Sequence, residues 1–203
     1  MAKGRFITFE GIDGAGKSTQ VEVIHQTIVA RGIEVVRTRE PGGTPLSEKI
    51  RELLLTQSME PSTETLLFFA SRAEHIAKVI KPSVERGAWV LSDRFTDATY
   101  AYQVGGRGFP ASKVEALEAW TQEGFGPDLT VLFDIDPEVA ARRVAKARNL
   151  DRFEKESLDF FTRVRNAYLE RARQNPDRFL IIDSMRDKET VSDELRRIFS
   201  TWD

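Results

Sequence analysis

The sequence contains no cysteine. Disulfides, Cys-ligated zinc, iron–sulfur clusters and thiol catalysis are therefore excluded, and the composition is typical of a reducing compartment. The sequence also lacks any apolar run approaching the roughly 18 residues of a membrane span, so we expect no membrane association. Residues 1–5 lead directly into a predicted strand without a targeting segment, and we expect a cytoplasmic protein.

A strong excess of one charge is absent as well. Thirty Lys and Arg residues oppose 32 Asp and Glu residues, which gives a net charge of -2 at pH 7 and argues against a general nucleic-acid binder. There is no internal repeat, linker or low-complexity tract, and 203 residues predict a single domain, 1–203. The one departure is the segment 142–155, where six basic and two acidic residues give a local charge of +4.

Short apolar runs alternate with helical patterns along the chain. We expect helices from Lys17, after a cap at Thr44, after a cap at Ser62 and after Pro110, and a glycine-rich loop at 105–108. The expected strands are 5–10, 33–36, 88–92, 129–134 and 179–182. This alternation predicts an α/β fold, a three-layer sandwich with a five-stranded parallel sheet and helices on both faces.

The segment from Gly11 to Ser18 fits the pattern G-x-x-x-x-G-K-[ST] between a predicted strand and a predicted helix. In such a P-loop the glycines let backbone N–H groups surround a phosphate, and the helix N-terminus adds partial positive charge. Lys17 would reach the β- and γ-phosphates of ATP, and Ser18 would ligate Mg²⁺. The predicted nucleotide-binding residues of this region are Gly11, Ile12, Asp13, Gly14, Ala15, Gly16, Lys17, Ser18 and Thr19.

A P-loop does not specify the reaction. A GTPase switch would need a guanine-reading N-K-x-D, but Asn149, Asn166 and Asn175 are followed by Leu, Ala and Pro. A chain of this length with one P-loop favours a small phosphotransferase over a motor or a transporter ATPase.

Polar residues that follow the predicted strands are candidates for the rest of the site. Asp93 and Arg94 come directly after the third strand, where Asp93 would hold or orient Mg²⁺ and Arg94 would clamp an acceptor phosphate. For the turn at 39–44, a connecting role and a binding role remain open. Phe68 and Arg72 share a helix face. The alternatives to a binding role are that the Phe68 ring belongs to the core and that the Arg72 guanidinium is solvated. His25 and His75 are not at a spacing typical of metal ligands, and we interpret both as structural or surface residues. The basic segment 142–155 can be either part of the site or a solvated helix end.

Six motifs along nearly the whole chain resemble those of the thymidylate kinases in order and approximate spacing. They are F-E-G-I-D-G-A-G-K-S-T (9–19), T-R-E-P-G-G-T (38–44), L-L-F-F-A-S-R (66–72), D-R-F (93–95), A-Y-Q (101–103) and L-D-R-F-E (150–154). The resemblance implies a P-loop nucleoside monophosphate kinase that converts deoxythymidine monophosphate (dTMP) to dTDP with ATP and Mg²⁺, in dTTP synthesis. It also implies a homodimer.

The same resemblance implies roles for residues on the acceptor side. Phe68 would stack on thymine, Arg72 would bind its O4 edge and Thr99 would lie at its N3 side. Tyr102 would pack under the sugar and disfavour a 2′-hydroxyl, with Gln103 beside it.

Around the phosphates, the resemblance implies that Arg39 and Arg94 grip the acceptor phosphate, with Asp13 nearby, and that Pro41 belongs to the acceptor site through a cis Glu40–Pro41 bond. Some members carry an arginine inside the P-loop, where this sequence has Gly14, and others supply it from a lid. Here the lid is predicted at about 142–155. Its catalytic candidates are Arg148 and Arg152, the choice between them remaining open, and Arg143 would lie against adenine.

Two other functions remain open from the sequence alone. A P-loop kinase of another nucleoside monophosphate or small acceptor would use the same motif. A regulatory nucleotide-binding module without catalysis would need its arginines to face a protein. A nucleic-acid-binding NTPase is disfavoured by the charge balance and the small size.

Overall fold

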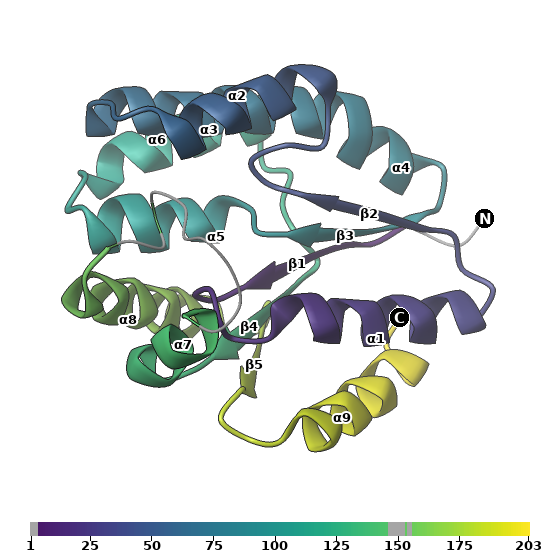
Figure 1. The fold of residues 1–203 in the computed structure, drawn as a ribbon. Helices are drawn as coiled ribbons and strands as arrows, with labels where there is room; N and C mark the ends of the chain where they lie inside the picture. Colours follow the sequence, from purple (N-terminus) through teal and green to yellow (C-terminus); the bar gives the residue numbers. More distant parts are fainter. Residues whose placement is uncertain (1–3, 146–152, 154–155) are drawn as a thin grey trace.

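The computed structural model describes residues 4–145, 153 and 156–203. Five parallel strands form one sheet in the order β2-β3-β1-β4-β5, and the predicted α/β class with a five-stranded parallel sheet is confirmed. The strands are β1 (Phe6–Glu10), β2 (Val35–Arg39), β3 (Trp89–Asp93), β4 (Leu129–Asp134) and β5 (Phe179–Asp183). All of them run with their carboxyl ends toward the same edge, on the left in Figure 1.

The second strand begins two residues later than the sequence predicts. Val35 of β2 pairs with Trp89 of β3, and the ladder continues to Arg39 opposite Asp93. Because β2 is an edge strand, its polar residues remain partly or wholly exposed, and the apolar run at 33–36 did not reveal them. The central strands β1, β3 and β4 are almost entirely buried, as their apolar sequences predict.

Helices cover both faces of the sheet (Figure 1). One face carries α1 (Lys17–Ala30) and α9 (Lys188–Thr201). The other carries α8 (Leu158–Gln174), the short α4 (Lys81–Glu85) and α5 (Thr96–Thr99), and the π-helical segments η1 (Ile76–Ile80) and η2 (Tyr100–Gly106). Farther out lie α2 (Pro45–Thr56), α3 (Pro61–His75) and α6 (Ala111–Gln122), and α7 (Pro137–Val144) follows β4. No helix among the described residues has the length and apolar character needed to cross a bilayer.

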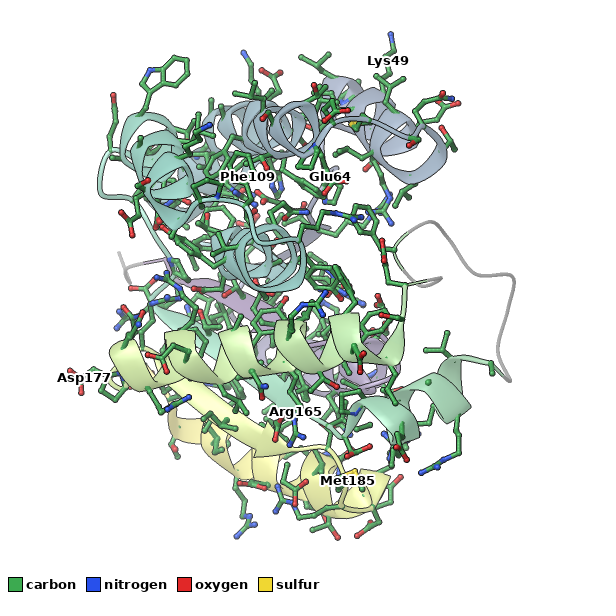
Figure 2. The ribbon with its side chains drawn as sticks, turned by 90° about the vertical axis from the view of Figure 1, so that its left-hand side faces the viewer. Lys49, Glu64, Phe109, Arg165, Asp177 and Met185 are labelled. Atoms are coloured by element: carbon green, nitrogen blue, oxygen red, sulfur yellow. The ribbon has the colours of Figure 1, made fainter. Side chains whose placement is uncertain are left out.

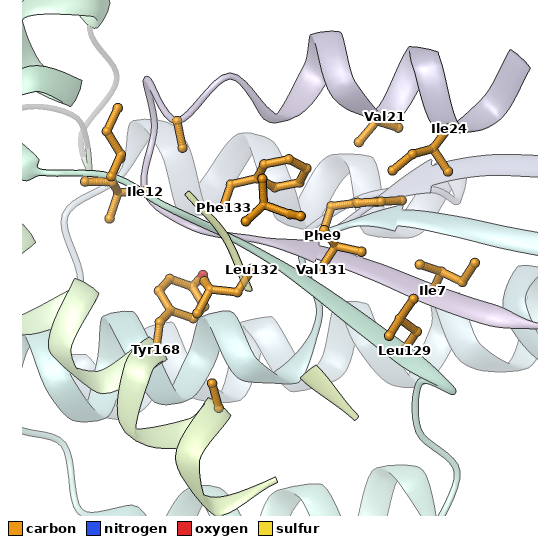
Figure 3. Close-up of a cluster of buried hydrophobic side chains, with 14 of the residues drawn as sticks. Ile7, Phe9, Ile12, Val21, Ile24, Leu129, Val131, Leu132, Phe133 and Tyr168 are labelled. Carbon is orange, nitrogen blue, oxygen red and sulfur yellow. The ribbon is translucent and has the colours of Figure 1, made fainter. Parts of the chain in front are cut away.

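The core lies on both sides of the strands. In Figure 3, Val21 and Ile24 of α1 lie over Phe9 and Phe133, and Tyr168 of α8 lies on the opposite side of the strands. Side chains alternate between the faces of a strand, so β1 sends Phe9 toward α1 and the neighbouring polar residues toward α8. The three layers are therefore the sheet and the helices that pack their apolar sides on each of its two faces.

Two local expectations were wrong. Ser62 is not a helix cap, because α3 begins at Pro61 with Glu60 as its N-cap residue. Gly105 and Gly106 are part of η2 rather than a loop. A Cβ at Gly105 would lie 2.4 Å from the Cβ of Ala167, so these glycines allow η2 to pack closely on α8. Thr44 does cap α2 as predicted, its hydroxyl oxygen accepting from the backbone N–H of Ser47 at 3.0 Å.

Candidate active site

One cavity of about 650 Å³ opens at the carboxyl ends of the strands. Figure 2 views the molecule from this side. The cavity contains P-loop residues at one end and residues of α3, α5 and η2 at the other. The sequence-predicted residues that line it are Asp13, Gly14, Gly16, Lys17, Ser18, Thr19, Arg39, Pro41, Phe68, Arg72, Asp93, Arg94, Thr99, Tyr102, Gln103 and Arg143. Gly11, Ile12 and Ala15 belong to the same P-loop but are buried and do not line the cavity.

The P-loop connects β1 to α1 in a tight left-handed path. Gly14 has a φ of 86°, and a Cβ there would lie 2.5 Å from the carbonyl oxygen of Ala140 in α7. A side chain such as arginine does not fit at this position without a shift of α7. Lys17 is buried, and its Nζ donates to the carbonyl oxygens of Gly11 at 2.9 Å and Ile12 at 3.2 Å. Burial and the nearby Arg94 lower the pKa of Lys17 below its usual value.

Arg94 connects the P-loop to the other end of the cavity. Its Nη2 donates to both carboxylate oxygens of Asp13 and to the hydroxyl of Tyr102, each at 3.1 Å. Its Nη1 donates to the hydroxyl of Tyr168 at 3.2 Å. Burial lowers the pKa of Arg94, but its neighbours outweigh this effect and raise that pKa above its usual value. These neighbours are Tyr102, Asp13, Tyr168 and Asp93. The guanidinium is a permanent positive charge held at the centre of the cavity.

Asp93 has a carboxylate oxygen that is available to bind a ligand. It ends β3, and its buried Oδ1 finds no hydrogen-bond partner among the described residues. Ser18 and Thr19 are exposed into the same cavity at the start of α1. Within the described part of the chain no cluster of three acidic or histidine side chains forms a complete metal cage. This arrangement fits Mg²⁺, which keeps several waters and takes only one or two protein ligands beside substrate phosphates.

At the far end of the cavity, Arg72 is almost fully buried, so the solvated alternative for it was wrong. Its Nε donates to Glu40 at 2.7 Å and its Nη2 to the hydroxyl of Thr99 at 3.2 Å. The buried Nη1 finds no partner among the described residues. Phe68 lines the same end, one helical turn away on α3. The pocket therefore offers an aromatic ring and an unpaired planar donor.

The sequence did not single out Glu40 as a site residue, but the structure places it behind Arg72. Its second oxygen lies 2.9 Å from Nδ1 of His75, whose Nε2 lies 2.6 Å from the hydroxyl of Thr38. His75 is fully buried, in agreement with its structural interpretation. The Glu40–Pro41 bond is cis, as the resemblance implies. A buried arginine needs an anionic partner, but no local pattern identifies Glu40 as the partner of Arg72.

The remaining predicted residues lie toward the rim or beyond the described residues. Arg39 is half-exposed and pairs with Glu48 at 2.8 Å. Arg143 donates to the backbone oxygens of Gly14 at 3.4 Å and Ser184 at 3.2 Å. Arg148 and Arg152 lie outside the described residues. The sequence reasoning did not name six further lining residues as site residues, which are Arg51, Leu55, Phe95, Ala98, Val144 and Phe153.

A P-loop and a pocket for a planar, polar group share one cavity, and the permanently charged Arg94 lies between them. In a parallel α/β fold, where ligands bind at the carboxyl edge of the sheet, this combination defines a P-loop nucleoside monophosphate kinase.

Comparisons with known proteins identify the family. The thymidylate kinase family model matches residues 9–195. A thymidylate kinase of Methylobacillus flagellatus is 60% identical over 193 residues, covering 95% of each chain. One of Paraburkholderia xenovorans is 57% identical over 204 residues, covering 98% of this chain and 99% of the relative. The crystal structure of thymidylate kinase from Ehrlichia chaffeensis superimposes with a TM-score of 0.77 at 35% identity, covering 97% of this chain and 98% of that one.

The chain belongs to the thymidylate kinase family. Enzymes of this family use ATP with Mg²⁺ to phosphorylate dTMP in the synthesis of dTTP, and this chain is accordingly an ATP-dependent dTMP kinase.

Proposed function

We propose that the cavity brings ATP and dTMP together around Arg94, so that the γ-phosphoryl group passes to dTMP and leaves dTDP and ADP. The observation that carries the proposal is the position of Arg94, which bonds to Asp13 of the P-loop and to Tyr102 of the acceptor end. Two anionic nucleotides repel each other, and a fixed cation between them offsets that repulsion in the transition state. The acceptor phosphate is an anionic nucleophile at neutral pH and needs no histidine base.

For the acceptor, we propose that thymine stacks on Phe68 and that the free Nη1 of Arg72 binds its O4 edge. The side chain of Thr99, fixed by Arg72, is assigned to the N3 side of the base. Tyr102 and the buried Gln103 are assigned to the sugar. Arg39 and Pro41 would complete the phosphate end, with Arg94 as the main anchor.

For the donor, Lys17 and the backbone from Gly11 to Thr19 would hold the ATP phosphates. Ser18 and Asp93 would hold Mg²⁺, which when bound neutralises charge on the transferring phosphoryl group. Arg143 would lie against adenine. Its contacts with Gly14 and Ser184 hold it at the P-loop end of the cavity.

We propose that the P-loop of this enzyme, which has no space for an arginine at Gly14, is complemented by an arginine from the lid segment 142–155. Both flanks of the segment support this role, because Arg143 and Phe153 each line the cavity. The candidates stay Arg148 and Arg152.

A panel of nucleoside monophosphates in a coupled ADP-release assay tests the proposed function. We expect rapid turnover with dTMP and Mg-ATP and little with the corresponding ribonucleotide, because Tyr102 is assigned to the sugar. Arg148→Ala and Arg152→Ala would retain ATP binding, and we expect at least one of them to lose a factor of about 10³ or more in turnover. Arg173→Ala, an exposed arginine of α8, is the matched control. Faster turnover with another acceptor would contradict the acceptor assignment, and unchanged turnover in both lid variants would contradict the lid assignment.

We also propose a homodimer in the cytoplasm. Among the described residues, four of the eight exposed large apolar side chains lie on the outer helices: Leu46 and Leu53 on α2, Leu66 on α3 and Trp120 on α6. Because α2 packs on α3 and α3 on α6, these helices present one outer layer that a second copy would cover. A cytoplasmic location is supported by the absence of cysteine and by nucleotide substrates of intracellular metabolism.

A further inference from the structure

Arg94 has an unusual backbone. Its φ is 70°, in the left-handed region that residues with side chains rarely adopt. Three hydrogen bonds hold this conformation. The Arg94 N–H donates to the carbonyl of Phe9 at 2.9 Å, the Ser92 hydroxyl donates to the Arg94 carbonyl at 2.8 Å, and the Phe95 N–H donates to Oε1 of Glu10 at 2.7 Å. A strained residue of this kind persists only where its surroundings over-determine it.

The other oxygen of Glu10 reaches the side chain of the same arginine. Tyr168 donates its hydroxyl proton to Oε2 of Glu10 at 2.7 Å and accepts from Nη1 of Arg94 at 3.2 Å. Glu10 and Tyr168 are both fully buried, and neither lines the cavity. One carboxyl group at the end of β1 therefore holds the main chain next to Arg94 directly and its guanidinium through Tyr168.

The guanidinium has two kinds of partner among the described residues. Asp13 and Tyr102 line the cavity and contact it from the ligand side, whereas Tyr168 contacts it from behind. A bound phosphate can replace Asp13 and Tyr102 as hydrogen-bond partners of Arg94. Tyr168 lies outside the cavity lining and keeps its contact with Arg94. Tyr168 also packs edge-to-face on Tyr102 with ring centroids 6.4 Å apart, so both tyrosines hold one orientation.

We infer that Glu10, acting directly and through Tyr168, is a positioning residue for Arg94 and thereby for the phosphate of dTMP. The inference rests on the role proposed above for Arg94. Burial and the repulsion of Asp97 raise the pKa of Glu10 to about 8, and the hydrogen bonds from Phe95 and Tyr168 oppose this shift.

Kinetics of four variants test this inference. Tyr168→Phe keeps the ring and removes the hydroxyl between Glu10 and Arg94, and Glu10→Ala removes both anchors. We expect kcat/KM for dTMP to fall about 10-fold in Tyr168→Phe and further in Glu10→Ala, mainly through KM, while the KM for ATP stays within about twofold. Glu10→Gln is the rescue variant. Its amide oxygen accepts from Phe95 and its amide nitrogen donates to the Tyr168 oxygen, so we expect it to retain most of the dTMP affinity.

Tyr100→Phe is the matched control. It deletes another tyrosine–glutamate hydrogen bond, the part-buried one from Tyr100 to Glu118 at 2.6 Å, and neither of these residues hydrogen-bonds to Arg94 among the described residues. A purely structural role for Tyr168 would lower the melting temperature in both tyrosine variants and leave the KM for dTMP unchanged in both, which would overturn the inference. If Glu10→Ala does not fold, Tyr168→Phe and Glu10→Gln still decide the question.

A double-variant cycle with Arg94→Lys separates this inference from the proposed function. We expect Arg94→Lys to raise the KM for dTMP, and Tyr168→Phe to add little in that background. Additive effects, or a normal KM for dTMP in Tyr168→Phe beside an impaired Arg94→Lys, would overturn the inference and leave the role of Arg94 intact. A normal KM for dTMP in Arg94→Lys would overturn both.

Discussion

Buried charges at single residues set the properties of this site. Arg72 and Arg94 lie inside the protein, and each is held by a carboxylate from a different strand end, Glu40 after β2 and Asp13 after β1. Removing one partner of such a pair leaves an uncompensated charge and costs more than an exposed ion pair contributes. The cavity therefore depends on these two carboxylates as well as on the arginines that they hold.

Glu10 gives a prediction about pH. Its folded-state pKa is raised to about 8 from 4.5, first by burial and then by Asp97, while Arg94 and Tyr168 oppose the shift. The folded protein thus binds a proton that the unfolded chain releases, and the stabilisation is lost as pH rises from about 5 to 8. In denaturant titrations, the free energy of unfolding of the wild type should fall relative to that of Glu10→Gln by at most about 1.4 kcal/mol per pH unit. A constant difference across this range would contradict the shift.

At the scale of elements, the contact of η2 with α8 shapes the side of the cavity that we propose for the acceptor. Tyr102 and Gln103 both belong to η2, and Arg163 of α8 donates from its Nε and Nη2 to the carbonyl of Gly106 at 3.2 and 2.9 Å. The two glycines that the sequence placed in a loop permit this approach. A helix with side chains at these positions would stand farther from α8 and would shift Tyr102.

Gly105→Ala tests that contact. The new methyl group would lie 2.4 Å from the Cβ of Ala167. Because a Cβ is fixed to its backbone, η2 and α8 would have to move apart. We expect the free energy of unfolding to drop by about 1–3 kcal/mol, the usual cost of overpacking. Gly126→Ala is the control, because a Cβ there meets no atom within 4 Å. Equal stability of the two variants in chemical denaturation would refute the close approach.

At the scale of the whole molecule, the outer layer of α2, α3 and α6 carries the proposed subunit contact. These helices lie on the side of the molecule away from α1 and α9 (Figure 1). They also carry Phe68 and Arg72, since both residues belong to α3. A second copy on this layer would therefore stiffen the helix that we propose to hold the base.

Leu53→Glu tests the dimer. Leu53 is 47% exposed on α2, and a charge buried there would oppose association. Sedimentation velocity should show a dimer for the wild type and a monomer for the variant. Val29→Glu on α1, also 47% exposed, should remain dimeric. A monomeric wild type at micromolar concentration would exclude the proposed dimer.

Local sequence determined much of the fold. Apolar runs located β1, β3, β4 and β5 within one residue at each end, and the P-loop pattern fell between β1 and α1 as expected. The misplaced strand is β2, which begins two and ends three residues later than predicted, because the polar residues of an edge strand carry no apolar signal. Ser62 was mistaken for a cap because the N-terminal preference of Pro61 decided where α3 begins.

The composition of the site was also readable from the sequence. The sequence analysis predicted sixteen of the residues that line the cavity, and the absence of cysteine had already excluded thiol and thiolate-metal chemistry. Only the tertiary structure decided which charges are buried and what holds them. Glu40 reaches Arg72 across 32 positions, and Tyr168 joins Glu10 across 158. Such pairs follow from the packing of α3 and α8 on the sheet, and a local pattern cannot encode a contact between segments that meet only when the layers form.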